Sequence, residues 1–212
     1  MGLDLSSAMT LIILAAGTSK PFGEFPKQLL DVGGETLLER QVRQFGEHCH
    51  ARHVATHRTE VKHPKCQTFV PSTHRWKCDT LLATHSIWCS DPRDKTIIIH
   101  GDVYFTDAAV KTIVLDSGSP ISFFWNNGIE GMEAYGVCFT PLHNDKVIHG
   151  AYSVVQECAK NNAPPHDGGL MRMMDALEHM GVWIDKIPLT DGTRDFDHPH
   201  KHAEWRKAMG LK

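Results

Sequence analysis

The chain has 212 residues, of which 41% are hydrophobic and 22% are charged, and its formal net charge is −3. This length favours one domain around one hydrophobic core. The slightly negative charge argues against binding to nucleic acid or to an acidic membrane by electrostatic attraction, so we expect neither as a partner.

The N-terminal sequence shows no export signal. The first ten residues, MGLDLSSAMT, lack a basic stretch before the apolar run, and the run from Thr10 to Ala16 is too short to span a bilayer. The six cysteines form no C-x-x-C pair, as expected for reduced thiols. We therefore expect a cytoplasmic protein.

Apolar runs and amphipathic stretches alternate along the first half of the chain. In chain order they predict a strand at 10–14, a helix at 37–47, strands at 52–56 and 67–70, a helix at 80–89, a strand at 96–100, a helix at 107–116 and a strand at 121–125. Thr36 and Glu39 have the spacing of a capping box for the first helix, and Asp79 or Thr80 is expected to cap the second. This alternation is typical of an α/β fold with a mostly parallel sheet.

The second half of the chain has a less regular pattern. We predict a strand at 133–139, helices at 151–160 and 169–180, a strand at 182–188, a final helix from about 200, and a mobile loop at 161–169. In such sheets, ligands bind beyond the carboxyl ends of the strands. The loops after Leu14, His100 and Pro188 are therefore the places where chemistry is expected.

The segment LIILAAGTSKPFGEFPKQLL, residues 11–30, joins an apolar strand to a loop of small, polar and basic residues. A Walker loop is excluded because the glycine after Gly17 comes one residue too late and is followed by Glu24, and the dinucleotide motif G-x-G-x-x-G is absent. What remains is a turn of small residues, with Lys20 and Lys27 able to lie beside phosphates. Taken alone, the AAG sequence is also typical of an ordinary tight turn.

Acidic residues follow two of the predicted strands. Asp102 comes directly after the buried strand TIIIH, and Asp191, Asp195 and Asp197 follow the last strand. Carboxylates at a sheet edge, together with substrate phosphates, are typical ligands of Mg²⁺. Asp191 and Asp195 can also be interpreted as turn or helix-capping residues.

The 15 histidines include two dense runs, at 48–57 and 198–202. Structural zinc sites need His or Cys at helical or finger spacing together with a partner pair, and the partner pair is not evident here. These runs are more simply interpreted as solvated surface histidines.

Three motifs, in order, resemble the sugar-nucleotidyltransferase superfamily of MobA-like and cytidylyltransferase-like NTP transferases. LAAGTSKPFGEFPKQLL resembles its amino-terminal signature LAAG-x-G-x-R…PK, GDVYF resembles its Gly-Asp metal motif, and FDHP resembles its late Asp-Thr-Pro motif. The stretches EFPKQLL and GETLLER are most similar to small cytidylyltransferases of the methylerythritol-phosphate and polyol-phosphate type. Ser19-Lys20 departs from the Gly-x-Arg of the family, and lysine lacks the bidentate fork of arginine.

The resemblance implies a single-domain, Rossmann-like α/β fold, with a mostly parallel twisted sheet flanked by helices, as in nucleotide-diphospho-sugar transferases. Within the domain 1–212, residues 1–125 would bind the nucleotide, and residues 126–212 would bind the acceptor and complete the metal site. The implied reaction is Mg²⁺-dependent transfer of CMP, or alternatively UMP, from the triphosphate to a small phosphorylated acceptor such as a sugar phosphate, with release of pyrophosphate. CTP is the expected nucleotide, and family members often form homodimers.

The resemblance also implies roles for individual residues. Lys27 would contact the α-phosphate, Lys20 would take the place of the family arginine, and Asp102 and Asp197 would hold Mg²⁺. Glu133 and Gly136 would line the acceptor site. The residues that would contact the nucleotide are Leu14, Ala15, Ala16, Gly17, Thr18, Ser19, Asp79, Thr80 and Gly101.

Two alternatives remain open. A GT-A glycosyltransferase also uses carboxylate-held metal, but its Asp-x-Asp spacing occurs here only late in the chain, at Asp195 and Asp197. A catalytically silent nucleotide-binding protein is the second alternative, because the Ser19-Lys20 loop is altered. Release of pyrophosphate would distinguish the transferase from both.

Overall fold

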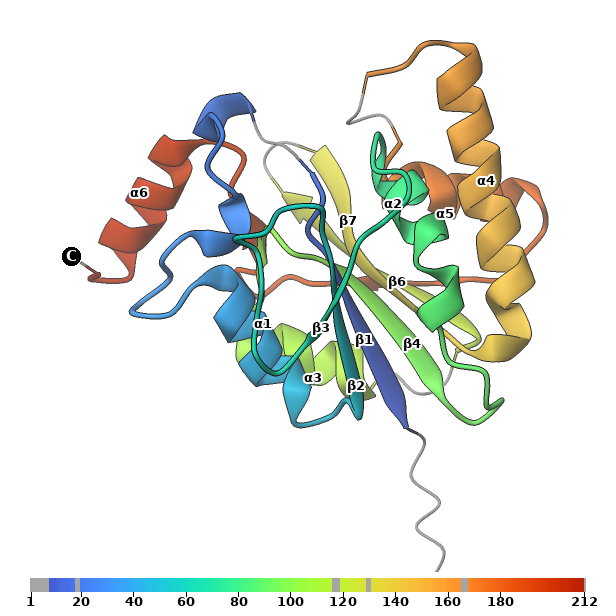
Figure 1. Cartoon of the computed structure of the whole chain (residues 1–212), viewed down its shortest axis with the longest axis horizontal. Coiled ribbons are helices and arrows are strands. Elements are labelled where there is room, and N and C mark those ends of the chain that lie inside the picture. Colours follow the sequence, from blue (N-terminus) through green and yellow to red (C-terminus); the bar gives the residue numbers. More distant parts are fainter. Residues whose placement is uncertain (1–7, 18–19, 116–118, 129–130, 165–167, 212) are drawn as a thin grey trace, which may run out of the picture.

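The computed structural model describes residues 8–17, 20–115, 119–128, 131–164 and 168–211. It contains a seven-stranded sheet with strand order β3-β2-β1-β4-β7-β6-β8 (Figure 1). The strands are β1 (Met9–Leu14), β2 (Ala51–Ala55), β3 (Gln67–Phe69), β4 (Lys95–His100), β6 (Ile121–Gly128), β7 (Gly131–Phe139) and β8 (Asp185–Pro188). Strand β7 is antiparallel to its neighbours β4 and β6, and all other neighbouring pairs are parallel. The mostly parallel α/β fold predicted from the sequence is confirmed.

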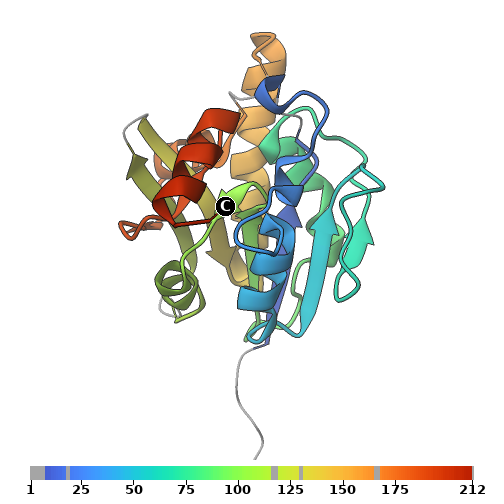
Figure 2. The ribbon, with the colours of Figure 1, turned by 90° about the vertical axis from the view of Figure 1, so that its left-hand side faces the viewer.

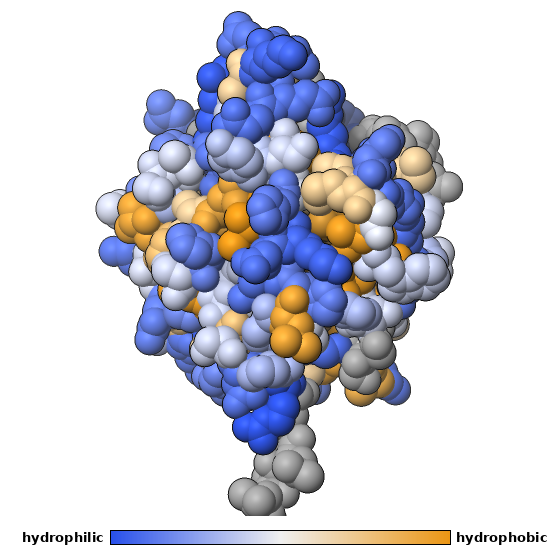
Figure 3. Space-filling view, turned by 90° about the vertical axis from the view of Figure 1, so that its right-hand side faces the viewer, coloured by the Kyte–Doolittle hydropathy of each residue, from blue (hydrophilic) through white to orange (hydrophobic). Residues whose placement is uncertain are grey.

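Helices cover both faces of this sheet (Figures 1 and 2). They are α1 (Leu37–Gly46), α2 (Lys77–Ala83), α3 (Asp107–Leu115), α4 (Asn144–Lys160), α5 (Leu170–His179) and α6 (Pro199–Ala208). Helices α2, α4 and α5 pack together on one face, and α1 and α3 pack on the other. The outer surface over α4 and α5 shows hydrophobic side chains interspersed among hydrophilic ones (Figure 3).

The alternating side chains of the central strands explain why both faces are covered. In β4, Ile98 belongs to the hydrophobic cluster under α2, α4 and α5, whereas Ile97 and Ile99 belong to the cluster under α1 and α3. Successive residues of a strand point to opposite faces, so an unbroken apolar strand must be buried on both sides. All six residues of β4 are buried.

A second, two-stranded sheet connects the end of β4 with the late part of the chain. Strand β5 (Val103–Tyr104) pairs antiparallel with β9 (Arg194–Asp195), and Val103 lies opposite Asp195. Helix α6 follows β9 and packs through Trp205 against Tyr104 and Phe196. This pairing brings residues far apart in the sequence to the same edge of the main sheet.

Most predicted elements are present, although the strand predicted at 182–188 is shorter, since β8 begins at Asp185. The capping box of α1 is confirmed: Glu39 N donates to Thr36 Oγ1 at 3.1 Å, and Thr36 N donates to Glu39 Oε2 at 2.7 Å. The helix predicted at 80–89 was wrong, because α2 covers Lys77–Ala83 and a short 3-10 helix follows at His85–Ile87. Asp79 therefore lies inside the first turn of α2 and does not cap it.

Helix α4 begins at Asn144, earlier than the predicted start at 151. The stretch 144–150 ends in Gly150, which has a low helix propensity and hides the helical pattern. The structure gives this glycine a packing role, since a Cβ added there would lie 2.8 Å from Leu177 Cγ on α5.

The loop predicted at 161–169 is only partly described, because residues 165–167 lie outside the described ranges. Over the parts of the chain that the structure describes, no helix is long and apolar enough to cross a membrane. The six cysteines are free thiols, and all of them except Cys66 are buried.

Candidate functional site

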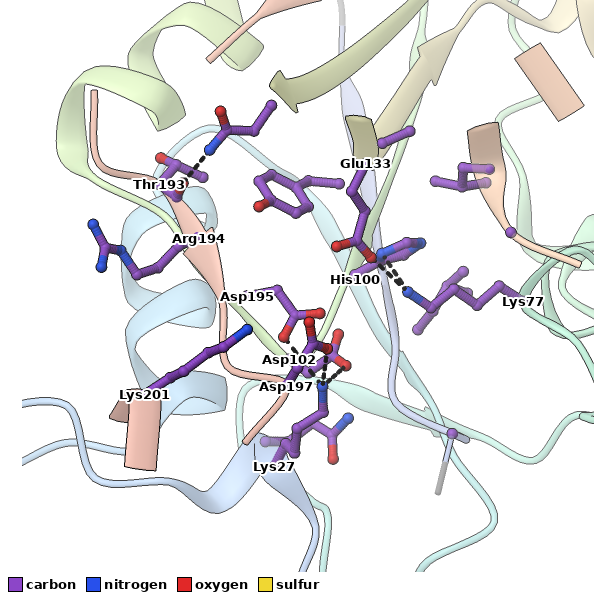
Figure 4. A pocket seen from close by; sticks show the side chains of 18 of the residues that line it. Lys27, Lys77, His100, Asp102, Glu133, Thr193, Arg194, Asp195, Asp197 and Lys201 are labelled. Atoms are coloured by element: carbon purple, nitrogen blue, oxygen red, sulfur yellow. Dashed lines mark hydrogen bonds and ion pairs between the residues drawn. The ribbon is translucent and has the colours of Figure 1, made fainter. Parts of the chain in front are cut away.

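A cavity of about 1360 Å³ opens at the carboxyl ends of β1 and β4. Its walls come from the loop after β1, the start of α2, the first residues of β7, strand β9 and helix α6 (Figure 4). The predicted site residues that line it are Leu14, Ala16, Gly17, Lys27, Thr80, Asp102, Glu133 and Asp197. The structure therefore brings together residues from the three loops where the sequence led us to expect chemistry.

Lys27 lies at the centre of an acidic cluster (Figure 4). Its Nζ is 2.8 Å from Asp102 Oδ2, 3.1 Å from Asp195 Oδ1 and 3.8 Å from Asp197 Oδ1. Asp102 follows the end of β4, and Asp195 is held beside it by the pairing of β9 with β5. Only 9% of the Lys27 side chain and 6% of the Asp195 side chain are exposed. These charges therefore interact with little screening by water.

The proximity of these groups shifts their pKa values. Burial opposes the charge of Lys27, but Asp102 and Asp195 outweigh it and hold the pKa of Lys27 above its usual value. Burial would also raise the pKa of Asp102, but Lys27 and Lys77 outweigh it and hold that pKa well below its usual range. Burial and the charge of Asp102 raise the pKa of Asp195 well above its usual range. Lys27 and Asp102 thus form the strongly charged pair of the site.

A second cluster, centred on Lys77 at the start of α2, lies on another wall of the cavity (Figure 4). Lys77 Nζ is 3.0 Å from His100 Nδ1 and 3.3 Å from Glu133 Oε1. Burial and the charge of Lys77 hold the pKa of His100 well below its usual value, so His100 is neutral. Its Nδ1 accepts from Lys77, which places the ring proton on Nε2. The buried Nε2 has no hydrogen-bond partner among the described residues.

The carboxylates suit a hard divalent cation. Asp102, Asp195 and Asp197 provide oxygen donors, and Glu133 adds a fourth carboxylate, against the two ammonium groups of Lys27 and Lys77. Within the described ranges, no three His, Cys, Asp or Glu side chains form a complete metal site. Mg²⁺ does not need one, because it binds through one or two carboxylates together with water and substrate phosphates. The donor chemistry therefore fits Mg²⁺.

Several residues predicted to contact the nucleotide or acceptor do not line the cavity. Ala15 is fully buried in the core. Asp79 lies in α2, where its Oδ2 accepts from the backbone N–H of Arg75 at 3.2 Å. Gly101 is packed against the end of β1, so that a Cβ there would lie 3.0 Å from the Leu14 carbonyl oxygen.

Gly136 lies inside the main sheet and is not among the residues that line the cavity. It pairs with Ile99 of β4, and a Cβ there would lie 2.8 Å from the Ile98 carbonyl oxygen. Thr18 and Ser19 lie outside the described residues, as does the side chain of Lys20, which begins a short 3-10 helix (Lys20–Phe22).

The structure adds lining residues that the sequence did not point to. They are His74, Arg75, Trp76, Lys77 and His100 on the side of α2, and Asn126, Tyr135, Thr193, Arg194, Lys201 and Trp205 on the side of α6. Lys77 lies two residues before Asp79, an expected nucleotide contact, and His100 is the last residue of a predicted strand. These neighbouring residues are the signals that could have indicated Lys77 and His100, whereas the contribution of α6 depends on the pairing of β9 with β5.

Residues 11–179 match the family model of the MobA-like NTP transferase domain. The chain belongs to this family. The match confirms the superfamily resemblance of the loop after β1, of GDVYF and of the segments between them, and it makes the chain an enzyme of the nucleotidyltransferase class. No curated protein sequence matches the chain.

Several nucleotidyltransferases are among the solved structures similar to this fold. The CTP:phosphocholine cytidylyltransferase of Streptococcus pneumoniae is 11% identical, with a TM-score of 0.64 over 95% of this chain and 99% of that chain. The 4-diphosphocytidyl-2C-methyl-D-erythritol synthase of Anaerococcus prevotii is 10% identical, with a TM-score of 0.65 over 97% of each chain. A putative glucose-1-phosphate thymidylyltransferase of Bacillus anthracis is 14% identical, with a TM-score of 0.65 over 95% of each chain. At these identities the likeness establishes the fold.

Proposed function

We propose that this nucleotidyltransferase moves a nucleoside monophosphate, CMP or alternatively UMP, from a nucleoside triphosphate to a small phosphorylated acceptor such as a sugar phosphate. The observation that carries the proposal is the position of Lys27. Its buried ammonium group lies between the carboxylates of Asp102 and Asp195. Lys27 lines the same cavity as the loop that follows β1. A cation and metal-binding carboxylates at this edge of the sheet suit a triphosphate that reacts at its α-phosphorus.

The chemistry requires positioning more than proton transfer. A phosphate monoester has its second pKa near 6, so at neutral pH it is mostly a dianion and already a nucleophile. Its oxygen forms a bond to the α-phosphorus while the bond to the pyrophosphate oxygen breaks. The main obstacle is the repulsion between two anions, and Lys27 would reduce it by donating to the α-phosphate.

Asp102 and Asp197 are the metal ligands that the resemblance implies, and the structure favours adding Asp195. The Asp195 side chain is 6% exposed and contacts Lys27 at 3.1 Å, whereas Asp197 is 49% exposed and lies at 3.8 Å. When bound there, Mg²⁺ would neutralise phosphate charge in the transition state.

The lining of the cavity includes candidates for contact with both substrates. We assign Leu14, Gly17 and Thr80 to the nucleotide and Glu133 to the acceptor. We accordingly keep residues 1–125 as the nucleotide-binding half and 126–212 as the acceptor-binding half of a single domain. Two of the similar structures are a CTP:phosphocholine cytidylyltransferase and a 4-diphosphocytidyl-2C-methyl-D-erythritol synthase, which supports cytosine as the base.

A pyrophosphate-release screen tests the proposal. Each nucleoside triphosphate is incubated with Mg²⁺ and a panel of phosphorylated acceptors, and one pair should give rapid release. Lys27→Ala should then slow the reaction by about 10²- to 10³-fold, the effect of losing one oriented transition-state donor. Lys186→Ala, which removes an exposed lysine paired with Glu178, serves as the control. Unchanged pyrophosphate release in both Lys27→Ala and Asp102→Ala would contradict the proposal.

The same screen addresses the silent nucleotide-binding protein, which remains the alternative because Ser19-Lys20 replaces Gly-x-Arg. Thermal stabilisation by a triphosphate without turnover on any acceptor would support that alternative. Release of a nucleoside diphosphate in place of pyrophosphate would indicate a glycosyltransferase.

A further inference from the structure

The ammonium group of Lys27 lies in the space between the carboxylates that would hold a divalent cation. Its ion pair with Asp102 is 2.8 Å long and its ion pair with Asp195 is 3.1 Å long (Figure 4). These are the contacts of a cation already bound by the two oxygen donors. A metal ion that used the same oxygens would therefore have to displace Lys27, because two cations cannot share them without strong repulsion.

A displaced Lys27 would need a new anionic partner. Its side chain is 9% exposed, and a buried ammonium group without a counter-charge is costly. Two other carboxylates of the cavity wall are poor substitutes: Asp197, 3.8 Å from Lys27, is itself an expected metal ligand, and Glu133 already pairs with Lys77 at 3.3 Å. A phosphate group of a bound nucleoside triphosphate would supply the missing negative charge.

We infer that Lys27 masks the metal site in the free protein, and that its transfer from Asp102 and Asp195 to the α-phosphate couples metal binding to triphosphate binding. This inference rests on the proposed function, which supplies both ligands. Each ligand alone binds weakly. The metal has to displace the ammonium group of Lys27 from the carboxylates, and the triphosphate has to compete with the same carboxylates for Lys27. Bound together, each raises the affinity of the other by the same factor, as thermodynamic linkage requires.

Calorimetric titration with Mn²⁺ measures this coupling without turnover. The wild-type protein is titrated with Mn²⁺ alone and then with Mn²⁺ in the presence of α,β-methylene CTP, whose bridging carbon prevents release of pyrophosphate. After correction for Mn²⁺ bound by the free analogue, we expect the Mn²⁺ affinity of the protein to rise about 10- to 100-fold when the analogue is present. Equal affinity under the two conditions would overturn the inference.

Substitution of Lys27 gives a second test, in which removal of the lysine should strengthen metal binding. Lys27→Met removes the ammonium group and keeps much of the side-chain volume, so Mn²⁺ should bind without nucleotide about tenfold more tightly than to the wild type. In this variant, the ratio of the Mn²⁺ affinities measured with and without the analogue should fall toward one. Lys27→Arg keeps the charge and should retain weak binding of Mn²⁺ alone.

Charge-matched controls separate displacement from a general change in charge. Lys77→Met lowers the positive charge of the same cavity but frees Glu133 as a partner for a displaced Lys27, so it should weaken the coupling less than Lys27→Met does. Lys186→Met lowers the charge at an exposed ion pair between β8 and α5 and should preserve the coupling. A gain in Mn²⁺ affinity with Lys186→Met as large as with Lys27→Met would overturn the inference. If Lys27→Met does not fold, Lys27→Gln removes the same charge and takes its place, and equal Mn²⁺ affinity of the wild type with and without the analogue still overturns the inference. Failure of both the CTP analogue and the corresponding UTP analogue to bind under any metal condition would instead contradict the proposed function.

Discussion

Asp195 and Asp197 lie in the same acidic segment of the sequence, but the structure shows that they differ in burial. The backbone of Asp195 is fixed opposite Val103 by the β5–β9 pairing, and its carboxylate is nearly inaccessible, whereas the Asp197 side chain is half exposed. A charge interaction in a buried site is worth more than one in contact with water. The two residues should therefore contribute unequally to catalysis.

We predict that Asp195→Asn lowers kcat by about 10²- to 10³-fold, the size of effect seen when one preorganised group is lost. Asp197→Asn should cost about tenfold or less, as expected for a half-exposed charge. Asparagine keeps the shape of each side chain and replaces one carboxylate oxygen, a potential metal ligand, with an amide nitrogen, so the two variants are matched. Steady-state pyrophosphate release at saturating Mg²⁺ measures both, and a larger loss in Asp197→Asn would restore Asp197 as the principal ligand after Asp102.

At the level of elements, α4 and α5 meet at a position where no side chain fits. A Cβ at Gly150 would lie 2.8 Å from Leu177 Cγ and 3.5 Å from Met173 Cγ. Gly→Ala in a helix normally stabilises by up to about 1 kcal/mol, but here the added methyl group must push the helices apart. We predict that Gly150→Ala lowers the free energy of unfolding by about 1–2 kcal/mol.

Chemical denaturation measures this loss. Ser153→Ala on the exposed side of α4 is the control, and it should leave the stability unchanged or slightly raised. In a double-mutant cycle, Leu177→Ala should remove the penalty of Gly150→Ala, because it removes the atom that the new methyl group would meet. Additive effects of the two substitutions would show that the helices do not collide at this point.

Helix α6 is attached to the segment after β1 by a long-range ion pair. Arg206 donates to the carboxylate of Asp31, and His202 Nε2 lies 2.8 Å from the Asp31 carbonyl oxygen. The hydrogen bonds from Arg206 and from Gly33 N–H lower the pKa of Asp31. A carboxyl group with a lowered pKa stabilises the folded state above its unfolded pKa of about 4, and this contribution is lost as the pH falls.

We therefore predict that Asp31→Asn lowers the melting temperature at pH 7 by up to about 4 °C, and that the difference from wild type narrows below pH 4. Differential scanning calorimetry across this pH range measures it. Asp175→Asn is the control, because it makes the same chemical change at an exposed position of α5. A difference in melting temperature between wild type and Asp31→Asn that stays constant down to pH 2 would show that the stabilisation does not come from the charge of Asp31.

At the level of the whole molecule, the fold could be predicted because its signals are local. The apolar run Thr96–His100 and the capping box at Thr36 each depend on nearby residues, and the alternation of strands and helices then indicates a parallel sheet. The reversed direction of β7 and the β5–β9 pairing could not be predicted, since both depend on contacts between distant segments. The start of α4 could not be predicted because Gly150 has a low helix propensity, and its reason for being there is the close packing of α4 against α5.

The candidate site was predictable in part for the same reason. Lys27 and Asp102 lie in motifs with a recognisable spacing, so the sequence was sufficient to single them out. Asp195 could equally be a turn residue in the sequence, and only its burial beside Lys27 distinguishes it. Lys77 contacts His100 and Glu133 from a helix whose start was predicted three residues too late.

Ligand binding should stabilise the whole fold, because the cavity is built from segments spread along most of the chain. A ligand at 100 times its dissociation constant stabilises a protein by about 2.7 kcal/mol, which corresponds to about 5–10 °C in melting temperature for a chain of this size. We predict a shift of this size with α,β-methylene CTP and Mg²⁺, and a smaller shift with the corresponding ATP or GTP analogue. Differential scanning fluorimetry measures the shifts, with Lys27→Ala as the control that should lose most of the CTP effect. Equal shifts with all bases would show that the protein recognises the triphosphate alone, and the assignment of cytosine would then be wrong.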